Sequence, residues 1–310
     1  MLYRKLGHTD LNVSLLGFGA SPLGNVFGAV DPSEATRAVL FAIDNGINFF
    51  DVSPYYGSTL AEKRLGEALA GHRDKVVLAT KCGRYGVNEF DFSARMVTRS
   101  LEDSLRRLKT DYVDLFQVHD VEFGDIQQII NETIPAMRQV QEQGKARYIG
   151  ITGYPLKMLV RILETIPVDS VLSYCRYNLM CVDMDALLTP VVEKLGIGLI
   201  NASPLHMGVL TRQGAPDWHP TSPDVREAAM KAATVANELG LDLSDLALRF
   251  CLDHPYVSST VVGMSTQRQV EQNLKALQGS PHQTIPGALE EILSPVRNHV
   301  WISGRLENQQ

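Results

Sequence analysis

The sequence predicts an α/β fold of the (β/α)8, or TIM, barrel class, formed by residues 1–310 as a single domain. Eight apolar runs of strand length alternate with segments of helical length over about 260 residues, close to the size of such a barrel. An open doubly wound sheet is the alternative, but the Gly-x-Gly-x-x-Gly motif expected after its first strand is absent. The predicted strands are 15–19, 47–52, 76–81, 113–118, 146–151, 169–174, 197–202 and 257–263.

Helix signals occur between these runs. Asp31-Pro32-Ser33-Glu34 predicts a helix start, with Asp as the N-cap, Pro at the first helical position and Glu at the third. This helix should end at Asn45-Gly46, where glycine supplies a left-handed C-terminal cap. Glycine precedes the runs at 146 and 197 in the same way, and helical patterns cover 94–108 and 126–142.

Two segments do not fit this alternation. Residues 206–224 are a polar insert that contains Trp218, and the segment after about residue 294 contains Trp301 but little periodicity. Long loops in compact domains are usually functional or disordered. Because exposed indole rings need an apolar partner, we expect these segments to contribute to the functional site.

Composition narrows the class of protein. Apolar residues make up 45% of the chain and charged residues 21%, which allows a large core. The net charge of −6 argues against nucleic acid as a partner. No apolar run approaches the roughly 20 residues of a membrane span, and the first residues lack the apolar stretch of a signal peptide. We therefore expect a cytoplasmic protein with a small-molecule partner, monomeric or weakly self-associating.

The cysteines form no CxxC pair and show no zinc spacing, so we expect reduced, packed thiols. A reactive role for Cys82, which follows Lys81, is the alternative. The four are Cys82, Cys175, Cys181 and Cys251.

Four residues carry the chemical prediction: Asp51, Tyr56, Lys81 and His119. Three of them end apolar runs, and Tyr56 follows the first run by five residues. Active sites of such barrels lie at the C-terminal ends of the strands. Each residue alone has an ordinary structural interpretation, namely a helix cap, a turn aromatic, a surface cation and a hydrogen-bonded histidine. Their joint position favours a catalytic group.

The predicted chemistry is proton transfer to and from an oxygen. A free tyrosine has a pKa near 10, and a neighbouring ammonium such as Lys81 stabilises the phenolate. Asp51 would hold Lys81 and keep it protonated. Tyr56 then donates a proton when a carbonyl is reduced and accepts one when an alcohol is oxidised, while His119 directs the reacting oxygen. This chemistry requires no metal.

The chain resembles the aldo-keto reductase family over nearly its whole length. Residues 3–14 (Tyr-Arg-Lys-Leu-Gly-His-Thr-Asp-Leu-Asn-Val-Ser), followed by Leu-Gly-Phe-Gly at 16–19, are similar to the opening of that family. Asp51-x4-Tyr56-Gly57, Lys81 and His119 match its catalytic tetrad in order and spacing. Segments 150–153, 203–208 and 263–273 resemble its cofactor-contact segments.

The resemblance implies a barrel with an N-terminal β-hairpin and extra C-terminal helices and loops, which binds an extended nicotinamide dinucleotide. It implies cofactor contacts at Ala20, Asp51, Thr152, Ser203, Leu205, Gly208, Gly263, Ser265, Gln269, Gln272 and Asn273. We expect the substrate to contact Tyr56, His119, Asp120 and Trp218.

Within the family, residues 17–24, 118–123 and 201–208 resemble the branch of L-galactose dehydrogenase and the aldose 1-dehydrogenases. That branch oxidises the anomeric carbon of a free aldose to a lactone with NAD. The chain departs from the wider family at Thr152-Gly153, where many members have Ser-Asn, and at Ala202, where a tyrosine often stacks on the nicotinamide. Tyr174 or Tyr177 is the expected substitute.

The resemblance also predicts NAD rather than NADP. Members that use NADP have a lysine and an arginine around the adenosine 2′-phosphate, at positions that are here Gly263 and Gln269. Arg268 is the remaining cation that would rescue NADP binding. Two other functions stay open, an NADPH-dependent reductase of small aldehydes and a nucleotide-sensing regulatory subunit without turnover.

Overall fold

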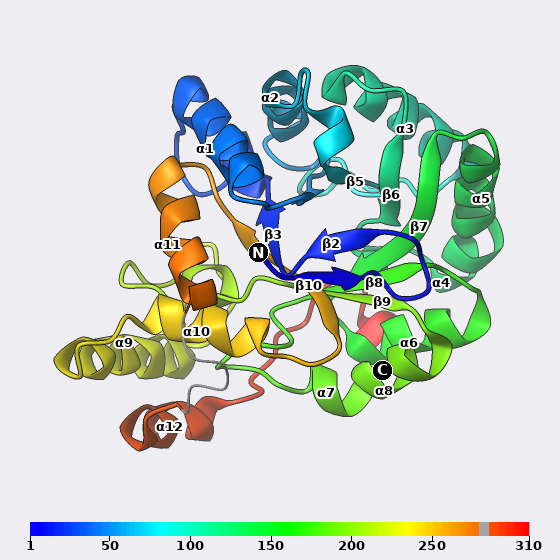
Figure 1. Ribbon diagram of the computed structural model, residues 1–310. Helices are drawn as coiled ribbons and strands as arrows, with labels where there is room; N and C mark the ends of the chain where they lie inside the picture. Colours follow the sequence, from blue (N-terminus) through cyan, green and yellow to red (C-terminus); the bar gives the residue numbers. More distant parts are fainter. Residues whose placement is uncertain (279–284, 310) are drawn as a thin grey trace.

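A computed structural model describes residues 1–278 and 285–309 (Figure 1). Eight parallel strands close into a barrel, and each pairs with the next along the chain until the last pairs with the first. The predicted fold is confirmed, and every barrel strand lies within two residues of its predicted bounds. The strands are β3 (Leu16–Gly19), β4 (Phe49–Asp51), β5 (Val77–Cys82), β6 (Val113–Val118), β7 (Ala146–Gly153), β8 (Ser170–Tyr174), β9 (Gly198–Ala202) and β10 (Val257–Gly263).

An antiparallel hairpin precedes the barrel, formed by β1 (Tyr3–Lys5) and β2 (Asn12–Ser14). Its apolar residues Leu6, Leu11 and Val13 are buried and join the interior cluster of the barrel. The hairpin therefore closes the N-terminal end of the barrel and leaves the C-terminal strand ends for polar groups. The barrel residues of that cluster are Phe49, Ala79, Leu115, Leu172, Ile200 and Val261.

Helices surround the strands (Figure 1) and cover them with the main apolar core. Asp31 caps the first helix as predicted, because its side chain accepts hydrogen bonds from the N–H groups of Ser33 and Glu34. The predicted helix at 126–142 is interrupted by a π-helical turn at Ile129–Thr133. The outer helices are α1 (Pro32–Asp44), α2 (Leu60–Ala68), α3 (Ala94–Leu108), α4 (Ile126–Gln128), α5 (Ile134–Glu142), α6 (Leu156–Thr165), α7 (Met184–Leu187), α8 (Thr189–Leu195), α10 (Leu243–Leu252) and α11 (Gln267–Gln278).

Two further helices, α9 (Pro223–Glu238) and α12 (Gly287–Leu293), pack against each other at the periphery (Figure 1). They form a separate apolar cluster with Leu179, Met180 and Leu210. Because α9 begins at Pro223, the last residues of the predicted insert at 206–224 belong to this helix. No helix in the described part of the chain is both long and apolar enough to cross a bilayer.

Candidate active site

Three adjacent strands, β4, β5 and β6, present the polar side chains of the candidate site. Side chains two residues apart on a strand share one face. Asp51, Lys81 and Gln117 each lie two residues beyond a member of the apolar interior cluster, so they form the next layer toward the C-terminal ends. His119 lies directly beyond β6 and is two residues after Gln117.

Lys81 is the centre of this layer and is 1% exposed. Its ammonium forms an ion pair with Asp51 and donates to the carbonyl of Val52 at 2.9 Å. It also lies 3.5 Å from the hydroxyl of Tyr56. Burial alone would lower the pKa of Lys81, but the adjacent Asp51 carboxylate and Tyr56 raise it above its usual value. Lys81 is therefore a charged group, as the sequence predicts.

Tyr56 is held by a close approach of two backbone segments. Gly57 has φ +62°, and a Cβ there would lie 2.1 Å from the carbonyl oxygen of Gly24. Only glycine fits between these two backbone segments, and it fixes the turn that carries Tyr56. The preceding residues make the same turn compact, because the N–H of Tyr56 donates to the carbonyl of Ser53 at 3.1 Å.

The pKa of Tyr56 lies above that of a free tyrosine, although Lys81 stabilises the phenolate as the sequence predicts. Burial is the largest effect, and together with the negative charges of Asp51 and Asp120 it outweighs the stabilisation of the phenolate by Lys81, so that the pKa of Tyr56 is raised to about 12. The sequence correctly predicts the direction of the Lys81 effect, but not the larger cost of burying a phenolate.

His119 is buried and lies edge-on to Tyr56, with ring centres 5.6 Å apart. Its Nδ1 is 2.9 Å from the hydroxyl of Ser53, which orients the ring. Burial lowers the pKa of His119 to about 3. The imidazole is therefore neutral near pH 7, and it can interact with a ligand by hydrogen bonding rather than by charge.

The structure separates the two further residues expected at the substrate. Asp120 lies beside the tetrad, because its Oδ2 is 3.7 Å from His119 Nε2. Trp218 is 54% exposed, and its ring neighbours are Phe27 and His219 rather than residues of the tetrad. We therefore retain Asp120 as a candidate substrate residue and find no support for Trp218.

The expected cofactor residues at the strand ends lie on four different strands or loops. Ala20 is buried and donates its N–H to the carbonyl of Asp51 at 2.8 Å. Thr152 is buried in β7, and its hydroxyl accepts from the N–H of Asp120 at 3.0 Å. Ser203, Leu205 and Gly208 follow β9, in a segment where Ser203 and Gly208 have φ values of +59° and +103°.

The remaining expected cofactor residues lie at the end of β10 and on α11. Gln269 accepts hydrogen bonds from the N–H groups of Ser265 (2.8 Å) and Thr266 (3.2 Å), and so caps the start of α11. Gln272 donates to Asp245 at 3.2 Å, while Asn273 lies half-buried on the same helix. Gly263 ends β10 and lies against Pro22, which a Cβ would approach to 3.0 Å.

The residues present fit a nicotinamide dinucleotide. Gln117 donates to Asp51 at 3.0 Å, and its Oε1 is buried without a hydrogen-bond partner among the described residues. The strained segment after β9 and the start of α11 follow the seventh and eighth barrel strands. Barrels of this class commonly bind phosphate at that position.

Of the two tyrosines expected to replace the nicotinamide-stacking tyrosine, only one is exposed enough to contact a ligand. Tyr177 packs on Phe250, with ring centres 5.1 Å apart, and is 8% exposed, so it is not available to a ligand. Tyr174 ends β8 and is partly exposed, with its hydroxyl 3.1 Å from Glu122. Tyr174 remains the candidate.

Sequence reasoning missed four residues that shape the site: Ser53, Arg84, Gln117 and Glu34. Ser53 and Gln117 could have been found, because each lies two residues from a tetrad member in sequence. Arg84 and Glu34 act through contacts with residues distant in the chain, at Asp120 and Gln267. No local pattern indicates those contacts.

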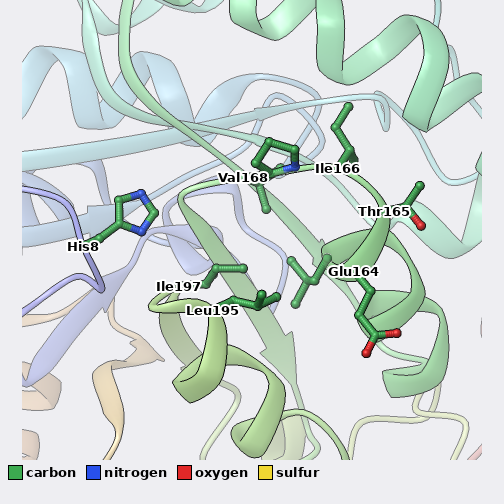
Figure 2. A pocket seen from close by; sticks show the side chains of 9 residues that line it. His8, Glu164, Thr165, Ile166, Val168, Leu195 and Ile197 are labelled. Atoms are coloured by element: carbon green, nitrogen blue, oxygen red, sulfur yellow. The ribbon is translucent and has the colours of Figure 1, made fainter.

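A separate hollow of about 250 Å³ lies at the opposite end of the barrel (Figure 2). His8 of the N-terminal hairpin and the segments that lead into β8 and β9 line it. Its remaining lining is mostly apolar, and it contains none of the tetrad.

The four cysteines are buried free thiols, and burial raises the pKa of Cys82. The prediction that they are packed, reduced thiols is therefore confirmed.

Comparison with known proteins gives consistent results. The model of the Aldo/keto reductase family matches residues 15–283. The chain is 46% identical over 316 residues to L-galactose dehydrogenase of Arabidopsis thaliana, with 98% of both chains covered. It is 30% identical over 331 residues to D-arabinose 1-dehydrogenase of Saccharomyces cerevisiae, again over 98% of both chains. The solved structure of aldo-keto reductase AKR11C1 from Bacillus halodurans, in its holo form, is 27% identical, has a TM-score of 0.79 and covers 100% of both chains.

Proposed function

We propose, from the premise that this chain belongs to the aldo/keto reductase family, that it oxidises a free aldose at C1 to the lactone with NAD. L-galactose is the first substrate to test, because the relative with 46% identity is an L-galactose dehydrogenase. The observation that carries the proposal is the contact of Tyr56 with Lys81 and His119 at the strand ends. These groups can remove a proton from a sugar hydroxyl.

A bound nicotinamide dinucleotide would supply the hydride acceptor for C1 of the sugar. Tyr56, reacting as the phenolate, accepts the proton of the C1 hydroxyl and becomes the neutral phenol, while C1 gives up its hydrogen as hydride. The Lys81 ammonium, 3.5 Å from the Tyr56 hydroxyl, favours the phenolate at that moment. Asp51 and Gln117 keep the ammonium charged and fixed, through the ion pair and the 3.0 Å hydrogen bond to Asp51.

His119 orients the reacting oxygen as a neutral imidazole. Because its pKa lies at about 3, it stays uncharged across the physiological range. Its Nδ1 is engaged by Ser53, so Nε2 is the nitrogen available to the substrate. A neutral ring beside the charged Lys81 avoids a second positive charge in a buried site.

The charges around α11 support NAD over NADP. Gly263 and Gln269 provide no cation for a 2′-phosphate, and Gln269 already caps the start of the helix. Glu34 of α1 adds a carboxylate there, which accepts from the N–H of Gln267 at 2.9 Å. Arg37, which forms an ion pair with Glu34, and this N–H lower the pKa of Glu34, so the carboxylate is charged and offsets the positive charge of Arg37 toward a phosphate. A ribose diol, in contrast, can donate to it.

A substrate panel tests the proposal. The purified protein is incubated with NAD or NADP and a series of free aldoses, and formation of the reduced cofactor is followed by absorbance. Reduction of NAD by an aldose supports the proposal. Reduction of aldehydes with NADPH but no aldose oxidation supports the reductase alternative. Cofactor binding without turnover of any substrate supports the regulatory alternative.

A further inference from the structure

A buried ion pair joins Arg84 and Asp120 directly beside His119. Arg84 Nη1 donates to Asp120 Oδ2 at 2.6 Å, and the same oxygen is 3.7 Å from His119 Nε2. The two side chains are 15% and 6% exposed. On average such pairs add little net stability, because the cost of desolvation offsets the attraction. The position of the pair beside a tetrad member indicates a role in the reaction.

The Arg84 guanidinium is fixed by aromatic rings. Its central carbon lies 4.0 Å from the ring centre of Tyr55 and 5.0 Å from that of Phe123, and Phe123 in turn stacks on Phe90 at 4.5 Å. Arg84 Nη2 also donates to the Tyr55 hydroxyl at 3.2 Å. Cation–π contacts of this kind strengthen when they are desolvated. The guanidinium therefore cannot leave Asp120 without losing its ring contacts.

Asp120 is held with equal rigidity. Its φ of +53° lies in the left-handed region, which is uncommon for residues other than glycine, although aspartate adopts it more often than most. The hydroxyl of Thr152 accepts from the N–H of Asp120 at 3.0 Å and retains this conformation. Backbone strain of this type occurs preferentially at functional sites. Here it turns the carboxylate toward His119 and Arg84.

We propose that Asp120 recognises the substrate hydroxyl on the carbon next to the reacting carbon, and that Arg84 is the positioning residue that aims and charges Asp120. This inference rests on the proposed aldose oxidation. The oxygen of the reacting carbon lies near His119 Nε2 and the Tyr56 hydroxyl. Because neighbouring oxygens of a sugar are about one hydrogen-bond length apart, the next hydroxyl comes within reach of Asp120 Oδ2.

The pair would make the site selective for hydroxylated substrates. A carboxylate oriented for a hydroxyl is left without its donor when the substrate lacks that hydroxyl, and such losses discriminate strongly. Simple aldehydes and deoxy sugars would be disfavoured even though the tetrad can act on them. Arg84 contributes to this selectivity through Asp120, without contacting the reacting atoms.

The inference is tested by removing the substrate hydroxyl and by substituting the two residues of the ion pair, separately and in combination. An aldose and its 2-deoxy analogue, which lacks only the hydroxyl next to the anomeric carbon, are compared as substrates of the wild-type protein and of Arg84→Met, Arg84→Lys and Asp120→Asn. We expect the wild type to prefer the aldose by roughly ten- to a hundredfold in kcat/KM. In Arg84→Met and Asp120→Asn this ratio should fall close to one, mainly through KM for the aldose. Arg84→Lys should restore only part of it, since lysine keeps the charge but not the planar stack.

Two controls separate recognition from general damage. Arg106→Met removes the exposed Arg106–Asp103 pair on α3, and it should leave the ratio unchanged. Binding of NADH, followed by fluorescence, confirms that each variant is folded. An unchanged ratio in either Asp120→Asn or Arg84→Met overturns the inference while leaving aldose oxidation intact. Absence of aldose turnover by the wild type overturns the proposed function and this inference together.

Discussion

The Lys81 ammonium lies 3.5 Å from the Tyr56 hydroxyl, inside an interior layer where Lys81 is 1% exposed. In this arrangement a buried charge acts on a group whose own burial opposes ionisation. The net pKa of Tyr56, about 12, is the balance of these two effects. The rate and the pH dependence of the reaction both depend on that balance.

The first prediction concerns the pH dependence of aldose oxidation. Because the pKa of Tyr56 lies at about 12, the phenolate fraction rises about tenfold per pH unit over the range from 7 to 10. We expect the rate of hydride transfer to rise across this range. No inflection should occur near 6.5, since the pKa of His119 lies at about 3. Single-turnover rates measure the step directly, and a rate that falls with pH would argue against Tyr56 as the proton acceptor.

The second concerns Lys81→Met. The variant removes the charge that favours the phenolate, so hydride transfer should slow by roughly 10²–10⁴-fold. It also leaves Asp51 buried without its partner, which costs about 3–5 kcal/mol of folding stability. Adding Asp51→Asn to the variant removes that uncompensated charge. The double variant should recover much of the unfolding free energy, measured by denaturant titration, but not the rate; recovery of both would show that Lys81 is only structural.

The third concerns cofactor choice and Glu34. Glu34→Gln keeps the hydrogen-bond acceptor for Gln267 but removes the negative charge at the start of α11. The ratio of kcat/KM for NADP to that for NAD should rise roughly two- to fivefold, the size expected for a solvent-accessible charge. The effect should weaken at high salt.

Glu102→Gln, a change of equal charge at the Glu102–Lys145 pair, serves as the control for Glu34→Gln. An equal response of both variants would exclude a specific role of Glu34.

For a further shift toward NADP, Gln269→Arg is a more suitable substitution than Gly263→Lys. A Cβ at Gly263 would lie 3.0 Å from Pro22.

The fourth prediction concerns the buried carboxyl of Glu122 and the C-terminal segment. Glu122 Oε1 accepts from Tyr174 at 3.1 Å and from Ser303 at 3.0 Å, with no cation among these partners. Burial, followed by Asp120, raises the pKa of Glu122 to about 8. The folded protein therefore holds a proton that the unfolded chain releases at ordinary carboxyl pKa values.

The stability contributed at Glu122 is accordingly complete at low pH and declines as pH rises toward 8, by up to about 1.4 kcal/mol per pH unit. Glu122→Gln removes this titration. Unfolding free energies of both proteins at pH 5, 6.5 and 8 should show the variant gaining on the wild type as pH rises. A difference that stays constant with pH would mean that Glu122 does not titrate in this range.

The sequence predicts the barrel and the tetrad because both depend on local signals. Apolar runs end in Asp51 and Lys81, and parallel neighbours bring such ends together without further information. The contact between Glu34 and Gln267 could not be predicted, because it joins residues 233 positions apart and forms only when the barrel closes. The Arg84–Asp120 pair depends on left-handed backbone at Asp120, which no local motif indicates.

Tyr56 and Trp218 show two further limits of the sequence. The sign of the net pKa shift at Tyr56 depends on how deeply the ring is enclosed, which residue types and spacing do not give. Trp218 is a large aromatic residue in a long loop, and its ring lies beside that of Phe27 at a centre distance of 5.8 Å. Its contact with a substrate stays a prediction, because it depends on loop conformation, which residue types do not give.

The most direct test of the proposed chemistry is the rate of hydride transfer from L-galactose to NAD in Tyr56→Phe, measured in a single turnover. The substitution keeps the ring and its edge-on contact with His119 but removes the hydroxyl that exchanges the proton. We predict a decrease of roughly 10²–10⁴-fold, with NAD binding retained. A rate close to that of the wild-type protein would contradict the assignment of Tyr56 as the proton acceptor.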